Sequence, residues 1–481
     1  MSIVSQLILS LIFANIVAAI AAIILERRNP AASAAWVTVI FMLPVAGIVL
    51  FFLLSQNISA RKLYNLSEFE EMKIDSSLEN QINEIKNGTY RFSTEEGKLW
   101  QDMIHLNQLY GRAYYSQNNS VEFITDGRQM FDTMMQDIMS ARETINIMFF
   151  IVKNDETGRQ FIDALTQKAR EGVEVRLLLD SMGSRQINDR VLRDFLDAGG
   201  KRAYFFPRKL NLVNFDFNYR NHRKLAVIDG IIGYTGGFNI AREYLGLKKK
   251  FGYWRDTHIR ITGQSVQDIN ARFILDWRTA SKEKIVLSEA FYSGVISEGN
   301  TGIQIVSSGP DSVKEEVKRS LMKMITSAER SIYVQTPYFV PDDSILESLK
   351  MAAQCGVDVR VMIPCMPDHP LVYWATYSYA GELVKSGGRV FIYENGFLHS
   401  KTMVVDGEVG TVGSANFDRR SFSLNFESNA FIYDKKEAQT MERIFCEDLK
   451  ECRELTISLY ENRSRTIKLK EVAARLLSDL L

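Results

Sequence analysis

The chain of 481 residues is long enough for two or three domains. Its 58 basic residues balance its 58 acidic ones, and this neutrality argues against a nucleic-acid-binding protein, which would usually carry a basic surface. Four cysteines and five histidines are scattered without the spacing of a zinc site or a disulfide framework, so we expect free thiols and no structural metal.

The N-terminal segment is far more apolar than the rest of the chain. Residues 3–25 carry no charged side chain, ERRNP interrupts the pattern at 26–30, and residues 31–55 are apolar again. Each run reaches the roughly 20 residues that a membrane-spanning helix needs. A cleaved signal peptide is the alternative, but no positive segment precedes the first run and the second run follows at once. The pattern predicts a transmembrane hairpin over residues 1–56, with helices at about 3–25 and 33–55.

A polar and charged segment follows, with only weak helical periodicity, over residues 57–118. We expect it to be a membrane-proximal connector. Beyond it, the composition becomes that of an ordinary α/β protein.

The rest of the chain contains an internal duplication. Residues 140–180 and 327–364 each read as helix, buried strand, helix and buried strand. Gly172 and Gly356 lie between the second helix and the second strand, where a helix C-terminus favours glycine. Helices that alternate with apolar strands predict a sheet covered by helices. We therefore expect an α/β fold of two similar sandwich halves with pseudo-twofold symmetry. The predicted halves are residues 119–295 and 296–481.

One short motif occurs in both halves. NHRKLAVIDG in the first and LHSKTMVVDG in the second share a histidine, a lysine two residues later and an aspartate five residues after the lysine. These residues are His222, Lys224 and Asp229 in the first half and His399, Lys401 and Asp406 in the second. Because alternating residues of a strand share a face, we expect each histidine and lysine to project side by side. An imidazole beside an ammonium suits chemistry on a phosphate.

Further residues match between the halves. Asn239 ends GGFN and Asn416 ends GSAN, while Asp256 in WRDTH aligns with Glu427 in NFESN. We expect these two acids to orient the imidazoles, each fixing a tautomer. The motif aspartates lie at the far end of the strand, at about 3.3 Å per residue, so their position favours holding the following turn.

Neither half holds a complete set of catalytic groups, so we expect the halves to build one site together. The repeat departs from symmetry at one place, because Gly237 stands where the second half has Ser414. If the serine hydroxyl binds phosphate, only the second half supplies it.

The paired HxKx₄D motifs, followed by GGxN or GSxN, resemble the signature of the phospholipase D superfamily. ERRNPAASAAW, DHPLVYW and NFDRRSF extend the likeness, and the chain is similar to bacterial cardiolipin synthases from end to end. The resemblance implies condensation of two phosphatidylglycerols to cardiolipin and glycerol through a phosphohistidine intermediate. It implies no metal, nucleotide or other cofactor.

The resemblance also implies roles for the matched residues. It makes His222 the nucleophile and His399 the acid and base, although the symmetry of the sequence leaves this order open. It includes Asp229 and Asp406 in the catalytic motifs. The lysines, together with Asn239, Asn416 and Ser414, would bind the phosphate oxygens.

A multi-pass protein of the bacterial inner membrane is the implied setting, with phosphatidylglycerol and cardiolipin of the bilayer as partners and no nucleic acid. Arg27 and Arg28 in the loop match Arg61 and Lys62 beyond the hairpin, so the distribution of positive charge predicts no orientation. The sequence predicts no oligomeric state.

Related reactions remain as alternatives. The same catalytic core can hydrolyse phospholipids, transfer phosphatidyl groups to serine or cut nucleic acid. The hairpin and the neutral charge disfavour a nuclease, which would carry a basic groove, and the intact motifs disfavour an inactive membrane scaffold. No motif distinguishes water from a lipid alcohol as the acceptor, so the resemblance alone favours the synthase.

Overall fold

The computed structural model describes residues 3–25, 30–43, 46–48, 51, 68–205, 219–285, 299–312, 314–476 and 478. It divides into two compact units, of which the first contains the N-terminal helices and the second contains both histidine motifs. The predicted domain boundaries near residues 56 and 295 lie outside the described residues.

The N-terminal unit contains two helices that pack on each other. α1 (Ile3–Leu25) coincides with the first predicted span, whereas α2 (Pro30–Met42) covers only the beginning of the second. Trp36, Ile40 and Phe51 form a small buried apolar cluster. Within the ranges described, no helix combines the length and the apolar character that crossing a membrane requires, so the predicted transmembrane hairpin is not confirmed.

The first half is a mixed sheet with helices, as the alternating pattern predicts. β4, β3 and β2 run parallel, β2 then pairs antiparallel with β6, and β7, β8 and β1 follow in antiparallel order. The strands are β1 (Ser116–Asp126), β2 (Thr144–Phe149), β3 (Glu174–Asp180), β4 (Lys201–Phe205), β5 (Arg220–Asn221), β6 (Leu225–Ile228), β7 (Ile232–Gly236) and β8 (Trp254–Gly263). The helices are α7 (Gly127–Ser140), α8 (Glu156–Arg170), α9 (Arg193–Asp197) and α10 (Ser265–Ser281).

The second half repeats this arrangement, which confirms the predicted duplication. β13, β12 and β10 are parallel, β10 pairs antiparallel with β15, and β16, β18 and β9 follow. The strands are β9 (Thr301–Ser308), β10 (Ser331–Gln335), β11 (Phe339–Val340), β12 (Asp358–Pro364), β13 (Arg389–Tyr393), β14 (Phe397–Leu398), β15 (Thr402–Val405), β16 (Val409–Gly413), β17 (Phe417–Asp418), β18 (Asn425–Tyr433) and β19 (Cys452–Glu454). The helices are α11 (Glu316–Ser327), α12 (Asp343–Gln354), α13 (Pro370–Lys385), α14 (Arg419–Ser423), α15 (Lys435–Leu449), α16 (Ile457–Glu461) and α17 (Arg465–Leu476).

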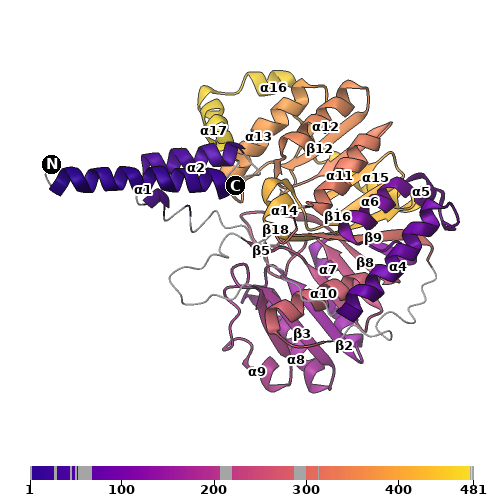
Figure 1. Ribbon diagram of the computed structural model, residues 1–481. Helices are drawn as coiled ribbons and strands as arrows, with labels where there is room; N and C mark the ends of the chain where they lie inside the picture. The colour runs from indigo at the N-terminus through magenta and orange to yellow at the C-terminus, as the bar shows by residue number, and fades with distance from the viewer. Residues whose placement is uncertain are drawn as a thin grey trace. The chain divides into compact units, whose positions relative to one another are not determined.

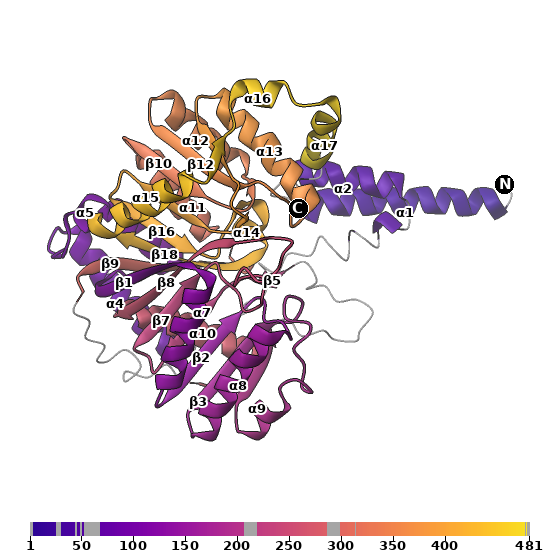
Figure 2. The same cartoon turned by 180° about the vertical axis from the view of Figure 1, so that it is seen from behind.

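The halves join through their last sheet strands. β1 of the first half pairs antiparallel with β9 of the second, so β8, β1, β9 and β18 lie between the two sets of parallel strands (Figures 1 and 2). Ile259 and Ile261 share one buried apolar cluster with Ile303 and Ile432 from the other half. Burial of this shared surface stabilises the two halves as one body, since removing apolar area from water contributes about 25 cal/mol per Å².

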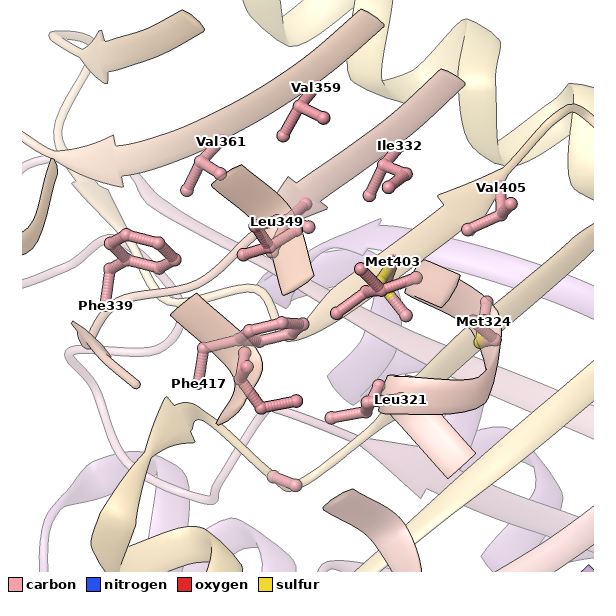
Figure 3. Packing of buried hydrophobic residues seen from close by; sticks show 14 of the residues in the cluster. Leu321, Met324, Ile332, Phe339, Leu349, Val359, Val361, Met403, Val405 and Phe417 are labelled. Atoms are coloured by element: carbon pink, nitrogen blue, oxygen red, sulfur yellow. The ribbon is translucent and has the colours of Figure 1, made fainter. Parts of the chain in front are cut away.

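Each half also has an apolar core of its own. In the second half, Leu321 and Met324 of α11 and Leu349 of α12 pack against Ile332 and Val361 of the parallel strands (Figure 3). The first half has an equivalent cluster between α7, α8 and the strands β2 and β3. These cores set the parallel strands of both halves rigidly against their helices.

The glycine prediction for the helix ends is confirmed. Gly172 follows α8 with φ +90° and Gly356 follows α12 with φ +95°. Only glycine adopts this backbone region without strain, and it lets the chain reverse from helix into strand.

The predicted connector contains folded helices. They are α4 (Glu68–Lys86), α5 (Glu95–Leu99) and α6 (Gln101–Gly111). Met103 and Ile104 of α6 are fully buried in the core of the second half, and Asn107 donates to Gln304 of β9 at 3.0 Å. Residues 68–111 are therefore part of the second compact unit.

Candidate active site

The two histidine segments each cross to the other half. β5, just before His222, lies parallel to the start of β18, and His222 N donates to Phe426 O at 2.9 Å. β14, just before His399, lies parallel to the start of β8, and His399 N donates to Arg255 O at 2.7 Å. These backbone bonds fix each histidine against the strand that carries the acid of the opposite half.

The alternation in KLAVIDG predicts that each histidine and lysine lies on a strand. This prediction is wrong, because neither pair lies within a strand. Residues 222–224 form a short loop between β5 and β6, and residues 399–401 form the equivalent loop between β14 and β15. β5 and β14 each pair with a strand of the other half, whereas β6 and β15 pair with strands of their own half. The chain therefore leaves one strand and enters the next at the histidine and lysine. The expected proximity still holds, because Lys401 Nζ lies 2.9 Å from His399 Nδ1.

Both imidazoles are held by the expected acids, and each acid comes from the other half. His222 Nδ1 lies 3.0 Å from Glu427 Oε1 and 3.1 Å from the carbonyl oxygen of Ser414. His399 Nδ1 lies 2.6 Å from Asp256 Oδ2. Carboxylate and carbonyl oxygens only accept hydrogen bonds, so we assign the proton to Nδ1 and the lone pair to Nε2. Lys401 then donates to His399 O rather than to Nδ1.

The two acids are themselves positioned differently. Ser414 Oγ donates to Glu427 Oε2 at 2.5 Å and accepts from Ser428 N at 3.0 Å. Asp256 instead accepts from Thr257 N at 2.8 Å. A Cβ atom at Gly237 would lie 1.9 Å from Asp256 Oδ1. The difference between Gly237 and Ser414 therefore goes together with the difference between the acids. Gly237 lies beside Asp256, and Ser414 lies beside the longer Glu427.

Both lysines are buried beside their own histidines. Lys224 Nζ donates to His222 O at 2.5 Å, and Lys401 Nζ donates to His399 O. Burial lowers the pKa of Lys224 to about 7 and that of Lys401 to about 8. Two ammonium groups are thus kept out of water next to two imidazoles and titrate near neutral pH. An anionic ligand would favour their charged forms.

The same burial keeps the imidazoles neutral. It lowers the pKa of His399 to about 4, with the charge of Lys401 adding to the effect, and it also lowers the pKa of His222. Burial alone would raise the pKa of Asp256 and Glu427, but the neighbouring lysines and imidazoles bring both below their ordinary values. Neutral imidazoles with ionised partners are suited to nucleophilic attack and to proton transfer.

The motif aspartates contact backbone rather than the imidazoles. Asp229 accepts three bonds of 2.8 Å from the backbone N–H groups of residues 142–144. Asp406 accepts three of 2.7–2.8 Å from residues 329–331. Both have positive φ, +51° and +55°, at the turn after the strand. These contacts are those expected of a turn anchor.

The asparagines occupy equivalent places after the turns of β7 and β16, and both are buried. Phe150 and Arg223 also contact the site residues, and the sequence motifs do not predict these contacts. The Phe150 ring lies 5.0 Å from that of His222, and Lys224 Nζ lies 5.5 Å from the Phe150 centroid. Arg223 Nε donates to Glu427 O at 3.0 Å and so ties the histidine loop to the acid strand. In the sequence, only the position of Arg223 directly after His222 points to this contact.

The chain is similar in sequence to known proteins over nearly its whole length. A family model described as "Cardiolipin synthase, PLD-like domain" matches residues 134–277 and 321–449, and one described as "Phospholipase_D-nuclease N-terminal" matches residues 13–56. The chain is 46% identical to "Cardiolipin synthase" of Listeria welshimeri, with 100% of both chains covered. It is also 46% identical to "Major cardiolipin synthase ClsA" of Bacillus subtilis, with 99% of this chain and 100% of that protein covered.

Solved structures resemble it at the level of the fold. The crystal structure of phosphatidylserine synthase from Haemophilus influenzae superposes with a TM-score of 0.60 at 14% identity, covering 79% of this chain and 97% of that one.

Proposed function

The chain belongs to the family of cardiolipin synthases with phospholipase D-like domains, and from this premise we propose that it is a phosphatidyltransferase that converts two phosphatidylglycerols into cardiolipin and glycerol. The observation that carries the proposal is the pair of imidazoles, each oriented through Nδ1 by an acid of the opposite half. Two such imidazoles serve a two-step transfer, in which one attacks phosphorus and the other moves protons.

In the first step, Nε2 of one histidine attacks the phosphorus of the first phosphatidylglycerol. The other histidine enters this step as imidazolium, with a proton on Nε2 that the anionic phosphodiester and the carboxylate partner favour against the effect of burial. The bond from phosphorus to the headgroup oxygen breaks, and the leaving glycerol oxygen takes that proton. The products of this step are a phosphatidyl-histidine and free glycerol. By resemblance, His222 is the nucleophile and His399 the acid.

In the second step, the same His399, now neutral, removes the proton from a headgroup hydroxyl of the second phosphatidylglycerol. The resulting oxygen attacks phosphorus, and the bond from phosphorus to His222 Nε2 breaks. Cardiolipin leaves and both imidazoles return to their first state. Asp256 and Glu427 stabilise the imidazolium forms and hold the tautomers throughout.

Positive charge is needed where the phosphate oxygens become more negative. Lys224 and Lys401 would supply it from their buried places beside the histidines, and the amide N–H groups of Asn239 and Asn416 would add hydrogen bonds. Ser414, predicted from the sequence as a phosphate ligand, has its hydroxyl bonded to Glu427. We therefore assign it the positioning of that acid.

The N-terminal segment would keep the enzyme with its lipid substrates. We propose a transmembrane hairpin over residues 1–56 in the bacterial cell membrane, ahead of the halves at 119–295 and 296–481. The family match over 13–56 supports this, as do the exposed apolar side chains of α1. These are Ile3, Leu9, Leu11, Ile12, Phe13, Ile16, Val17 and Ile20. Resistance of the full chain to extraction from membranes by alkaline carbonate would support the hairpin, and release would contradict it.

The activity is tested by incubating the purified full chain with radiolabelled phosphatidylglycerol in vesicles and resolving the products. Cardiolipin with an equal amount of glycerol is the expected result. Phosphatidic acid with glycerol would identify a hydrolase instead, and no turnover would contradict both. The double variant His222→Ala, His399→Ala is the control, since it lacks both imidazoles.

A further inference from the structure

The two asparagines make different use of their amides. In the first half, Asn239 Oδ1 accepts from Ile151 N at 3.0 Å and Nδ2 donates to Tyr244 Oη at 3.2 Å. In the second half, Asn416 Nδ2 donates to Asp418 Oδ2 at 3.1 Å. Asn416 Oδ1 is buried and has no hydrogen-bond partner in the part of the chain that the structure describes. A buried acceptor without a partner is costly, so a ligand that donates a hydrogen bond would be favoured here.

A carboxylate lies beside this acceptor in the second half only. When GGFNIA is aligned with GSANFD, Asp418 stands where the first half has Ala241. Asp418 is buried, and its Oδ1 accepts from Ser421 N at 2.7 Å. Burial lowers the pKa of Lys401, and the charge of Asp418 is among those that oppose this, so the carboxylate is within electrostatic reach of the lysine. A carboxylate repels phosphate and accepts from hydroxyl groups, so its partner in a ligand would be a hydroxyl.

The two halves also differ in side-chain charge two residues after Ala241 and Asp418. Glu243 of the first half is neutralised by Lys153, whose Nζ lies 2.5 Å from its Oε1. The second half has Arg420 at this position. Arg420 lies in α14, which is capped by Asp418 and packs on β18, the strand that carries Glu427. Burial lowers the pKa of Arg420, and the charges of Asp418 and Glu427 oppose that shift. A guanidinium is well suited to a phosphodiester, because its planar donors match two phosphate oxygens.

We propose that Asn416, Asp418 and Arg420 form the subsite for the headgroup of the accepting phosphatidylglycerol. Its glycerol hydroxyls donate to Asn416 Oδ1 and to the Asp418 carboxylate, and its phosphodiester binds Arg420. The subsite holds the attacking hydroxyl at the phosphatidyl-histidine and gives the lipid alcohol an advantage over water. This inference rests on the proposed synthase activity and names the half that receives the acceptor.

The first test measures how the intermediate is partitioned. Asp418→Asn keeps an oxygen for the Ser421 N–H and removes the charge. In vesicles of labelled phosphatidylglycerol, we expect the ratio of cardiolipin to phosphatidic acid to fall roughly 10–100-fold, as for a lost hydrogen bond to a charged group. Release of glycerol should continue. The matched control is Asp343→Asn, because the Asp343 side chain is 91% exposed on the neighbouring α12.

The second test separates hydroxyl from phosphate recognition. Labelled phosphatidylglycerol is mixed with glycerol or 1-propanol as soluble acceptor. The wild type should prefer glycerol, Asp418→Asn should lose that preference, and Arg420→Gln should keep it while making less cardiolipin. Arg419→Gln is the matched control, since Arg419 Nη2 lies 3.8 Å from Asp343 on α12.

The outcomes are distinguishable because both readouts are ratios that do not depend on the folded fraction. A wild type that makes no cardiolipin would overturn the proposed function itself. An active wild type whose Asp418→Asn and Asp418→Ser variants keep the wild-type product ratio and glycerol preference would overturn the subsite alone.

Discussion

His222 Nδ1 lies 3.0 Å from Oε1 of Glu427, a residue of the opposite half of the duplication. The reciprocal pair, His399 with Asp256, has a distance of 2.6 Å. Each half therefore provides the imidazole whose partner acid lies in the other. Among the residues that the structure describes, neither of these two histidines pairs with an acid of its own half.

The acids are expected to control the tautomers. In Asp256→Asn and Glu427→Gln, an amide still bonds to the ring but no longer stabilises imidazolium, so turnover should fall roughly 10²–10⁴-fold. The thermal midpoint should change little. Turnover of both variants in one detergent, beside their thermal midpoints, checks this. Near-normal turnover in either would show that its imidazole needs no carboxylate.

The two histidines should fail at different steps. The His399→Ala variant still has its nucleophile, so a radiolabelled phosphatidyl-enzyme should accumulate after acid quench. In His222→Ala no label should be retained. Label in the His222 variant and none in the His399 variant would reverse the assignment, and wild-type turnover in either variant would contradict a single shared site.

Substitutions at Gly237 and Ser414 should both lower turnover, but to different extents. In Gly237→Ala, the new Cβ must displace the Asp256 carboxylate, whose Oδ1 would be 1.9 Å away, so turnover should fall about 10²-fold or more. The carboxylate is the end of a side chain and can move, so the fold should survive. In Ser414→Gly, Glu427 loses one hydrogen bond, and turnover should fall only about tenfold. Equal turnover of Gly237→Ala and wild type would contradict the steric argument.

The motif aspartates should act on stability. In Asp229→Asn and Asp406→Asn, the new residue still tolerates positive φ. However, each amide has one acceptor oxygen in place of a carboxylate that accepts three backbone hydrogen bonds. Each should cost about 1–3 kcal/mol of unfolding free energy. Thermal midpoint and turnover per folded molecule are the measurements. Lost turnover at an unchanged midpoint would give these residues a direct catalytic role.

The buried lysines should set the alkaline limit of activity. The pKa of Lys224 is lowered to about 7 and that of Lys401 to about 8, from the ordinary 10.5. Above these values the ammonium loses its charge, so kcat/KM, which reports the free enzyme, should fall as the pH rises through about 7 to 8. Arginine remains protonated there, so Lys401→Arg should remove the limb near pH 8. An alkaline limb at the same pH in both Lys→Arg variants would exclude the lysines as its source.

Much of the architecture follows from local signals in the chain. Alternation of helical and apolar segments predicts the two α/β halves, and Gly172 and Gly356 predict the helix ends, because a left-handed C-terminus needs a residue without Cβ. Repetition of the histidine motif identifies the matched residues, including Asp256 and Glu427, without any knowledge of their contacts.

Tertiary structure alone decided which groups meet. The chain's two copies would allow each imidazole to pair with the acid of its own half, and only the crossing of β5 onto β18 and of β14 onto β8 assigns them across the halves. The tertiary structure likewise decided that α6 lies in the core of the second half and that Ser414 bonds to Glu427. Such contacts join residues far apart in sequence, and their energies depend on packing and burial that no local pattern encodes.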